Sequence, residues 1–230
     1  MARQGLEIKH KRSYHWISVV LWLILFTLLL AAGWIGYRYF TTGELPSVIS
    51  AGALAANPAV DETAVTDSQK TSHIVAADEP RYISMPSLGV DKARIFKTGV
   101  DTNNLLAFTK NINDVGWYQK SALVGQGYGV VLLTGHNKGA GTNGAFSRIS
   151  SLKPGEDIII ERGDGKLFTY TVNNIQTMTV EEAGKTGMKT MLEPIDETRE
   201  NLTLVTTDGN WVPRIKQFEN RTVLRATAKD

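Results

Sequence analysis

Three polar side chains stand at the ends of strand-like segments, where a rigid scaffold can present them for chemistry. The apolar segment VVLLTGHN delivers His136 to its exposed end, and histidine serves as a general acid or base near neutral pH. The segment NLTLVTT ends in two hydroxyl groups, those of Thr206 and Thr207. The last such segment, FENRTVLRATA, carries Arg221 near its start, and arginine is a permanently charged donor suited to a peptide carbonyl or an anionic oxygen.

Taken singly, each of these residues has an ordinary explanation. A histidine after a strand can simply open a turn, threonine favours strands and strand ends, and an arginine beside an edge strand is usually a surface charge. Only their combination indicates a site, because strand ends on one rim of a barrel bring together residues that are distant in sequence.

The segments that must position these residues indicate a mainly β domain. From residue 79 onward, short apolar runs are separated by Gly, Asn, Asp and Pro, and helical patterns are brief. Many short strands with turn signals between them favour a barrel or a sandwich over a layered α/β fold. We predict strands at 81–85, 93–97, 115–118, 129–135, 157–161, 166–175, 201–206 and 222–226, and short helices at 103–108, 145–152 and 180–184.

An uncharged run from Trp16 to Ile35 is long enough to cross a membrane, which takes a helix of about 20 residues. Aromatic residues stand near both of its ends, and a basic cluster precedes it, so the positive-inside rule places the N-terminus in the cytoplasm. A cleaved signal peptide is the alternative, but its apolar region is usually about 7–15 residues long. We therefore expect a single-pass protein of the cell membrane whose C-terminal domain is extracytoplasmic.

This topology divides the chain into four parts. We predict a basic cytoplasmic N-terminus over residues 1–15 and a transmembrane anchor over residues 16–36. A flexible extracytoplasmic stalk, rich in Ala, Ser, Thr and Asp, is expected over residues 37–78, followed by the β domain over residues 79–230.

Charge and cysteine content exclude several classes of function. The first fifteen residues carry four basic residues and one acidic residue, which leaves about −1 for the rest of a chain of net charge +2, so the main domain is not a basic nucleic-acid binder. The chain contains no cysteine, which excludes disulfides, thiolate metal sites and a thiol nucleophile.

Two further patterns are weak as functional signals. Residues 139–144 spell G-x-G-x-x-G after a strand, but the following helix ends before Pro154 and is too short for a dinucleotide-binding crossover. We interpret the glycines as a flexible loop beside His136. The acidic residues between 157 and 200 lack the spacing of a calcium loop, so we expect no metal and no cofactor.

The TGH segment, the TLVT segment and an arginine fourteen residues after Thr207 together resemble the sortases, which are membrane-anchored cysteine transpeptidases of Gram-positive-type cell envelopes. The resemblance runs from Pro80 to the C-terminus. Further similar segments are PRYISMP at 80–86, VGWY at 115–118, Gly125 and Gly129, FSRI at 146–149 and LKPGE at 152–156, and the VGWY segment is similar to the GWY-bearing, class E- or F-like branches. The resemblance implies an eight-stranded β-barrel with short helices, preceded by one transmembrane helix, and it puts His136 and Arg221 in the family's histidine and arginine positions.

Thr207 occupies the family's cysteine position, where the sequence departs from the pattern. The family mechanism uses a thiolate to attack the carbonyl of an LPxTG-like sorting signal, and an amine of the cell envelope then resolves the thioester. Because a threonine hydroxyl is far less acidic than a thiol and carries an obstructing methyl group, Thr207 is either a weak nucleophile or a catalytically silent replacement. The resemblance therefore implies a protein that attaches surface proteins to the envelope with impaired catalysis, and an active Thr207→Cys form. The alternative is a non-catalytic module that binds sorting signals or envelope partners.

Overall fold

The computed structural model describes residues 15–42, 60–101, 105–212 and 214–229, in two units that comprise residues 1–47 and 48–230. The predicted N-terminal segment 1–15, apart from residue 15, lies outside the described residues, as does the stalk between 43 and 59. The first unit contains helix α1, His15–Thr42. Its stretch Ser18–Tyr37 has a mean hydropathy of 2.4 and none of it is buried, so the helix is long and apolar enough to cross a membrane.

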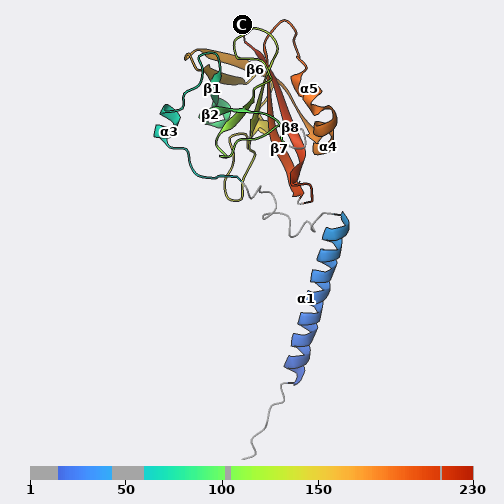
Figure 1. The fold of residues 1–230 in the computed structure, drawn as a ribbon. Coiled ribbons are helices and arrows are strands. Elements are labelled where there is room, and N and C mark those ends of the chain that lie inside the picture. The colour runs from blue at the N-terminus through green and yellow to red at the C-terminus, as the bar shows by residue number, and fades with distance from the viewer. Residues whose placement is uncertain (1–14, 43–59, 102–104, 213, 230) are drawn as a thin grey trace, which may run out of the picture. The chain divides into compact units, whose positions relative to one another are not determined.

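The second unit contains a closed barrel of eight strands in the order β1-β2-β3-β4-β7-β8-β6-β5 (Figure 1). The predicted mainly β fold is therefore confirmed, and each predicted strand overlaps one of the eight. Their bounds are β1 Pro80–Met85, β2 Val90–Thr98, β3 Val115–Tyr118, β4 Val130–Gly135, β5 Asp157–Arg162, β6 Leu167–Thr179, β7 Asn201–Val212 and β8 Gln217–Ala228.

Two pairs of neighbouring strands, β2 with β3 and β4 with β7, are parallel, and the other pairs are antiparallel. Every residue of β4 is buried, because the barrel interior covers one face and a second apolar cluster covers the other. Leu133 and Leu204 belong to the interior, whereas Leu132 and Val205 belong to the outer cluster. This alternation fixes which side chains of β4 and β7 point outward.

The outer cluster is covered by a helical segment between β6 and β7. It consists of α4 Val180–Glu182, a π-helical turn Ala183–Gly187 and α5 Met188–Leu192, and in Figure 1 it lies beside β7 and β8. Thr179 begins this segment with a reciprocal cap to Glu182. The helix predicted at 180–184 is therefore present and longer than expected.

The other two predicted helices differ from the structure. Over residues 145–152 the chain forms turns and one 3-10 helix, Ile149–Ser151. The helix predicted at 103–108 is wrong for its described residues 105–108, because the Asp101 side chain accepts a hydrogen bond from the backbone N–H of Leu105 and Val100 bridges to Leu106. Local bonding of an aspartate side chain to the backbone competes with helix formation in this way.

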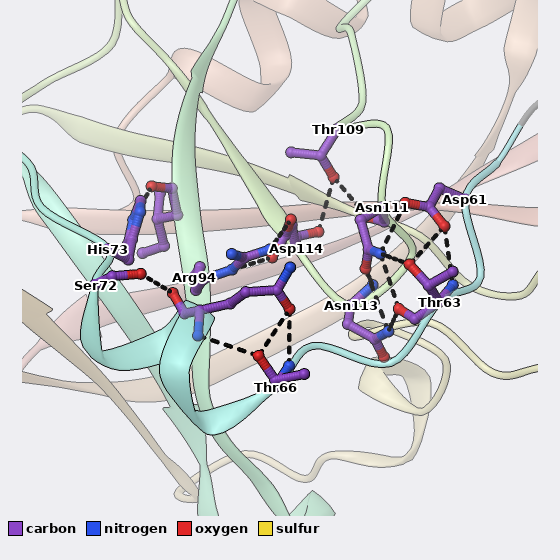
Figure 2. Close-up of polar contacts among 12 residues, drawn as sticks. Asp61, Thr63, Thr66, Ser72, His73, Arg94, Thr109, Asn111, Asn113 and Asp114 are labelled. Atoms are coloured by element: carbon purple, nitrogen blue, oxygen red, sulfur yellow. Dashed lines mark hydrogen bonds and ion pairs between the residues drawn. The ribbon is translucent and has the colours of Figure 1, made fainter.

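The predicted stalk also differs from the structure in its described second part, since residues 60–73, which we name the strap, lie against the barrel (Figure 2). Asp61 bridges to Asn111 in parallel, and the side-chain amide of Asn111 donates to the carbonyl of Thr63 at 2.9 Å. Helix α3, Asp67–Thr71, follows, and His73 is buried with its Nε2 2.9 Å from the carbonyl oxygen of Ile95. The polar residues that suggested a stalk make these hydrogen bonds, and the bonds hold the strap on the barrel where an apolar face is lacking.

Candidate active site

Strand register brings the three predicted site residues onto one face of the barrel. In the parallel pair of β4 and β7, Thr134 is the partner of Val205, and the same register continued by two residues puts His136 beside Thr207. In the antiparallel pair of β7 and β8, Thr207 is the partner of Arg221. Neighbouring strands lie about 4.7–4.9 Å apart, so the three residues form a row across adjacent strands, on the outward face to which Val205 also belongs.

All three residues are buried, with exposed fractions of 6% for His136, 7% for Thr207 and 3% for Arg221. His136 and Thr207 line one cavity of about 340 Å³, to which the strap contributes Val60 and the end of β7 contributes Trp211. The histidine and the residue in the predicted nucleophile position therefore share a common cavity.

Arg221 lines a second, smaller cavity of about 10 Å³ together with Val205, and Leu106 lines both cavities. Its guanidinium donates to the carbonyl oxygens of Phe218 at 3.2 Å and Asn220 at 3.0 Å. Burial lowers the pKa of Arg221 to about 10, so the group still carries its positive charge at neutral pH. The arginine thus supplies a buried charge next to Thr207, while it bonds to its own strand.

The protonation of His136 is set by burial and by one hydrogen bond. Its Nε2 lies 2.7 Å from the carbonyl oxygen of Thr109, and because a carbonyl can only accept, Nε2 carries the proton. Burial lowers the pKa of His136, and the bond to Thr109 opposes that shift in part. The ring of Phe108 packs at 5.3 Å between centroids. The neutral ring leaves Nδ1 unprotonated, which suits a proton acceptor better than a proton donor.

Two polar contacts join the end of β4 and the residues after it to the middle of β7. The hydroxyl of Thr206 donates to the carbonyl of Gly135 at 2.7 Å, and the side-chain amide of Asn137 donates to the carbonyl of Thr207 at 2.8 Å. Sequence reasoning missed Asn137 and Thr109 as positioning residues. The position of Asn137 directly after the TGH segment was a usable signal, whereas Thr109 directly follows the segment 103–108, which was predicted to be helical.

The described residues contain no group of three His, Cys, Asp or Glu side chains that could hold a metal ion. The side chains of His136, Thr207 and Arg221 offer an imidazole, a hydroxyl and a guanidinium. Such a set can bind a peptide carbonyl and stabilise negative charge on it.

Comparisons with known proteins find similarity over the barrel. The family model described as the sortase domain matches residues 83–229. Sortase C-1 from Actinomyces oris has a similar structure, with a TM-score of 0.50, 20% sequence identity, and coverage of 84% of this chain and 93% of that chain. A lid mutant of sortase A from Corynebacterium diphtheriae aligns with a TM-score of 0.49 and 24% identity over 70% of this chain and 76% of that chain. Among curated protein sequences, none matches this chain.

Proposed function

This chain belongs to the sortase family, and we propose that it is a membrane-anchored member that recognises LPxTG-like sorting signals of surface proteins. The observation that carries the proposal is that His136, directly after β4, lines one cavity with Thr207, and that Thr207 is paired with Arg221 on the neighbouring strand. His136 and Arg221 occupy the positions that the family uses for catalysis, and the cavity offers room for a peptide next to them.

We propose further that catalysis is impaired because Thr207 replaces the thiol. Attack on a peptide carbonyl needs a nucleophile that can lose its proton near neutral pH, and a threonine hydroxyl needs a dedicated base to do so. A neutral His136 can serve as that base only weakly, because burial already lowers its pKa and a weak base removes a proton poorly. Thr207 is then at most a slow nucleophile.

A second candidate function is a binding module that holds a sorting signal or an envelope partner without cleaving it. The bonding of Arg221 favours this alternative, because its guanidinium is engaged by the carbonyls of Phe218 and Asn220. A catalytic role in the protein as it stands would require the guanidinium to exchange these partners for the substrate oxyanion.

The location follows from helix α1. We propose that residues 16–36 anchor the protein in the cell membrane, with the basic N-terminus in the cytoplasm and the barrel outside, where sorting signals and amine acceptors of the envelope meet it. The apolar helix over Ser18–Tyr37 supports an anchor, and the positive-inside rule supports the orientation.

The test is a peptide-cleavage assay with a panel of LPxTG-like signals and an amine acceptor. The unmodified protein should give little or no product, whereas Thr207→Cys should raise turnover by orders of magnitude, because the buried charge of Arg221 can lower the pKa of a thiol at that place and the unprotonated Nδ1 of His136 can accept its proton. An oxyanion donor is worth about 2.7–4 kcal/mol in the transition state once a nucleophile attacks.

The matched controls carry a second change in the Thr207→Cys protein. Adding His136→Ala or Arg221→Ala should abolish the gain, whereas adding Tyr128→Ala, an exposed residue outside the cavity lining, should preserve it. Robust turnover by the unmodified protein that is lost in Thr207→Ala would instead make Thr207 a working nucleophile. Binding of signal peptides without turnover by any variant would favour the binding module.

A further inference from the structure

The loop that follows His136 holds a carboxylate on its backbone. Glu62 of the strap reaches across to residues 139–142, where its Oε1 accepts from the backbone N–H of Ala140. Its Oε2 accepts from the backbone N–H of Gly141 and from the hydroxyl of Thr142, both at 3.0 Å. Successive backbone N–H groups that converge on one anion form a nest, a recurring binding site for carboxylates and phosphates.

The glycine at position 139 makes room for this carboxylate. A Cβ atom added to Gly139 would lie 2.2 Å from Oε1 of Glu62, closer than any real contact. Its φ is not among the positive values, so the backbone alone does not require glycine here. The loop therefore contains both the donors and the open space that a carboxylate needs.

The site continues into a cavity of about 420 Å³, which Glu62 and Thr142 line together with Lys70 and Lys92. This cavity can take the remainder of a molecule whose carboxylate sits on the nest. The charges in its lining are mixed, because Asp91 and Asp114 stand there beside the basic residues, so the selection of a carboxylate rests on the nest itself.

The Glu62 carboxylate can leave the nest by rotation of its own side chain. The strap beside it is held on the barrel by other bonds, since Asp61 exchanges backbone hydrogen bonds with Lys110 and Ile112, and the side-chain amide of Asn111 donates to the carbonyl of Thr63. Hydrogen bonds to Gly141 and Ala140 lower the pKa of Glu62, so its carboxylate is charged at neutral pH. Side chains near the surface exchange rotamers rapidly, so this movement requires no unfolding of the barrel.

We propose that residues 139–142 form a carboxylate-binding site for a peptide ligand, and that Glu62 occupies this site in cis. The choice of peptide ligands rests on the proposed function, whereas the site itself does not.

The test follows the backbone amide signals of Ala140 and Gly141 by NMR, in full-length protein in detergent micelles, so it requires no turnover. One probe pair is pentaglycine with a free C-terminal carboxylate and the same peptide as its amide. The other is an LPxTG-like peptide with Glu at the variable position and its Gln counterpart. In Glu62→Ala, and in Glu62→Gln as the shape-preserving variant, the carboxylate form of at least one pair should shift these signals, and the matched neutral form should not.

The pair that responds identifies the source of the carboxylate as the acceptor or the sorting signal. The unmodified protein should bind the same peptide at least about tenfold more weakly, because a tethered carboxylate competes at an effective concentration in the millimolar range. Adding Gly139→Ala to Glu62→Ala should abolish the response, and Glu197→Ala, a change at an exposed acidic residue, should behave like the unmodified protein. No carboxylate-dependent shift in either Glu62 variant, or equal affinity with and without Glu62, would overturn the proposal.

Discussion

Breaking the ion pair between Arg94 and Asp114 is predicted to be a costly single change in the barrel. Arg94 lies in β2, Asp114 precedes β3, and the guanidinium meets the carboxylate through two bonds, Nε to Oδ1 and Nη2 to Oδ2, each 2.8 Å long (Figure 2). The two side chains are only 14% and 7% exposed. Such a bidentate pair satisfies both partners, but removal of one leaves an uncompensated buried charge.

The expected magnitude follows from this burial. Breaking a fully buried pair by removing one partner costs about 3–5 kcal/mol, and the partial exposure of Arg94 places the present case near the lower limit, at about 3 kcal/mol. For a domain of this size, 1 kcal/mol corresponds to roughly 2–4 °C, so Arg94→Met or Asp114→Leu should lower Tm by about 6–12 °C. The double variant should lose less than the sum of the two, because it removes both charges together.

The assay is a double-mutant cycle of unfolding free energies, measured by urea denaturation at pH 7 with thermal unfolding in parallel. The two single variants, the double variant and the unmodified protein should give a coupling energy of about 2 kcal/mol or more. The exposed pair Lys185–Glu181 provides the matched control, since its side chains are 72% and 73% exposed and solvent screens such a pair. Additive single effects at Arg94 and Asp114, or losses no larger than those of the control pair, would refute the reasoning.

Three further predictions concern pH, a buried carboxylate and membrane topology. Burial lowers the pKa of His73 and of His136 from the ordinary value of 6.5, so the unfolded chain binds more protons below that pH. The free energy of unfolding should therefore reach its full value above about pH 6.5 and decrease as the pH falls. Between pH 7.5 and pH 5.5, the decrease measured by denaturation should be smaller in His73→Gln than in the unmodified protein. The carboxylate of Glu200 is buried and accepts hydrogen bonds from the hydroxyl of Tyr170 and from two backbone N–H groups. Glu200→Gln should therefore lower the free energy of unfolding by about 2–3 kcal/mol, whereas Tyr170→Phe should lower it by about 1 kcal/mol, both measured by denaturation. A C-terminal alkaline phosphatase fusion should be active outside the cytoplasm and remain in membranes after a carbonate wash, whereas release of a shortened form would indicate a cleaved signal.

The barrel was predictable from sequence because its strands carry strong local signals. Val130–Gly135 is a continuous apolar run, as expected for a strand covered on both faces, and glycines and prolines mark the turns between the strands. The strand order was less accessible, since the parallel pairing of β4 with β7 depends on contacts between segments about seventy residues apart. That pairing, and not any local pattern, brings His136 beside Thr207.

The strap and the segment 105–108 were mispredicted for different physical reasons. In the segment 105–108, the local bond from the backbone N–H of Leu105 to the Asp101 side chain competes with a helix. The strap is a polar segment whose order comes from side-chain hydrogen bonds to distant backbone groups, such as the bonds of Asn111 to Thr63 and of Glu62 to Gly141. Composition indicates how much apolar surface a segment can bury, but it does not identify which distant donors will meet its carboxylates and hydroxyls. For that reason the sequence did not predict that the loop at 139–142 binds Glu62, although it did predict a glycine-rich loop there.

The central claim is that Thr207 occupies a nucleophile position in an otherwise assembled sortase site, and intact-protein mass spectrometry tests it most directly. The Thr207→Cys protein should be mixed with an LPxTG-like peptide in the absence of an amine acceptor and quenched in acid within seconds. The account predicts an added mass equal to the acyl part of the peptide, removed by hydroxylamine, and no such adduct on the unmodified protein or on Thr207→Cys combined with His136→Ala. The absence of any adduct on Thr207→Cys across a broad panel of signals, or an equally rapid adduct on the unmodified protein, would contradict it.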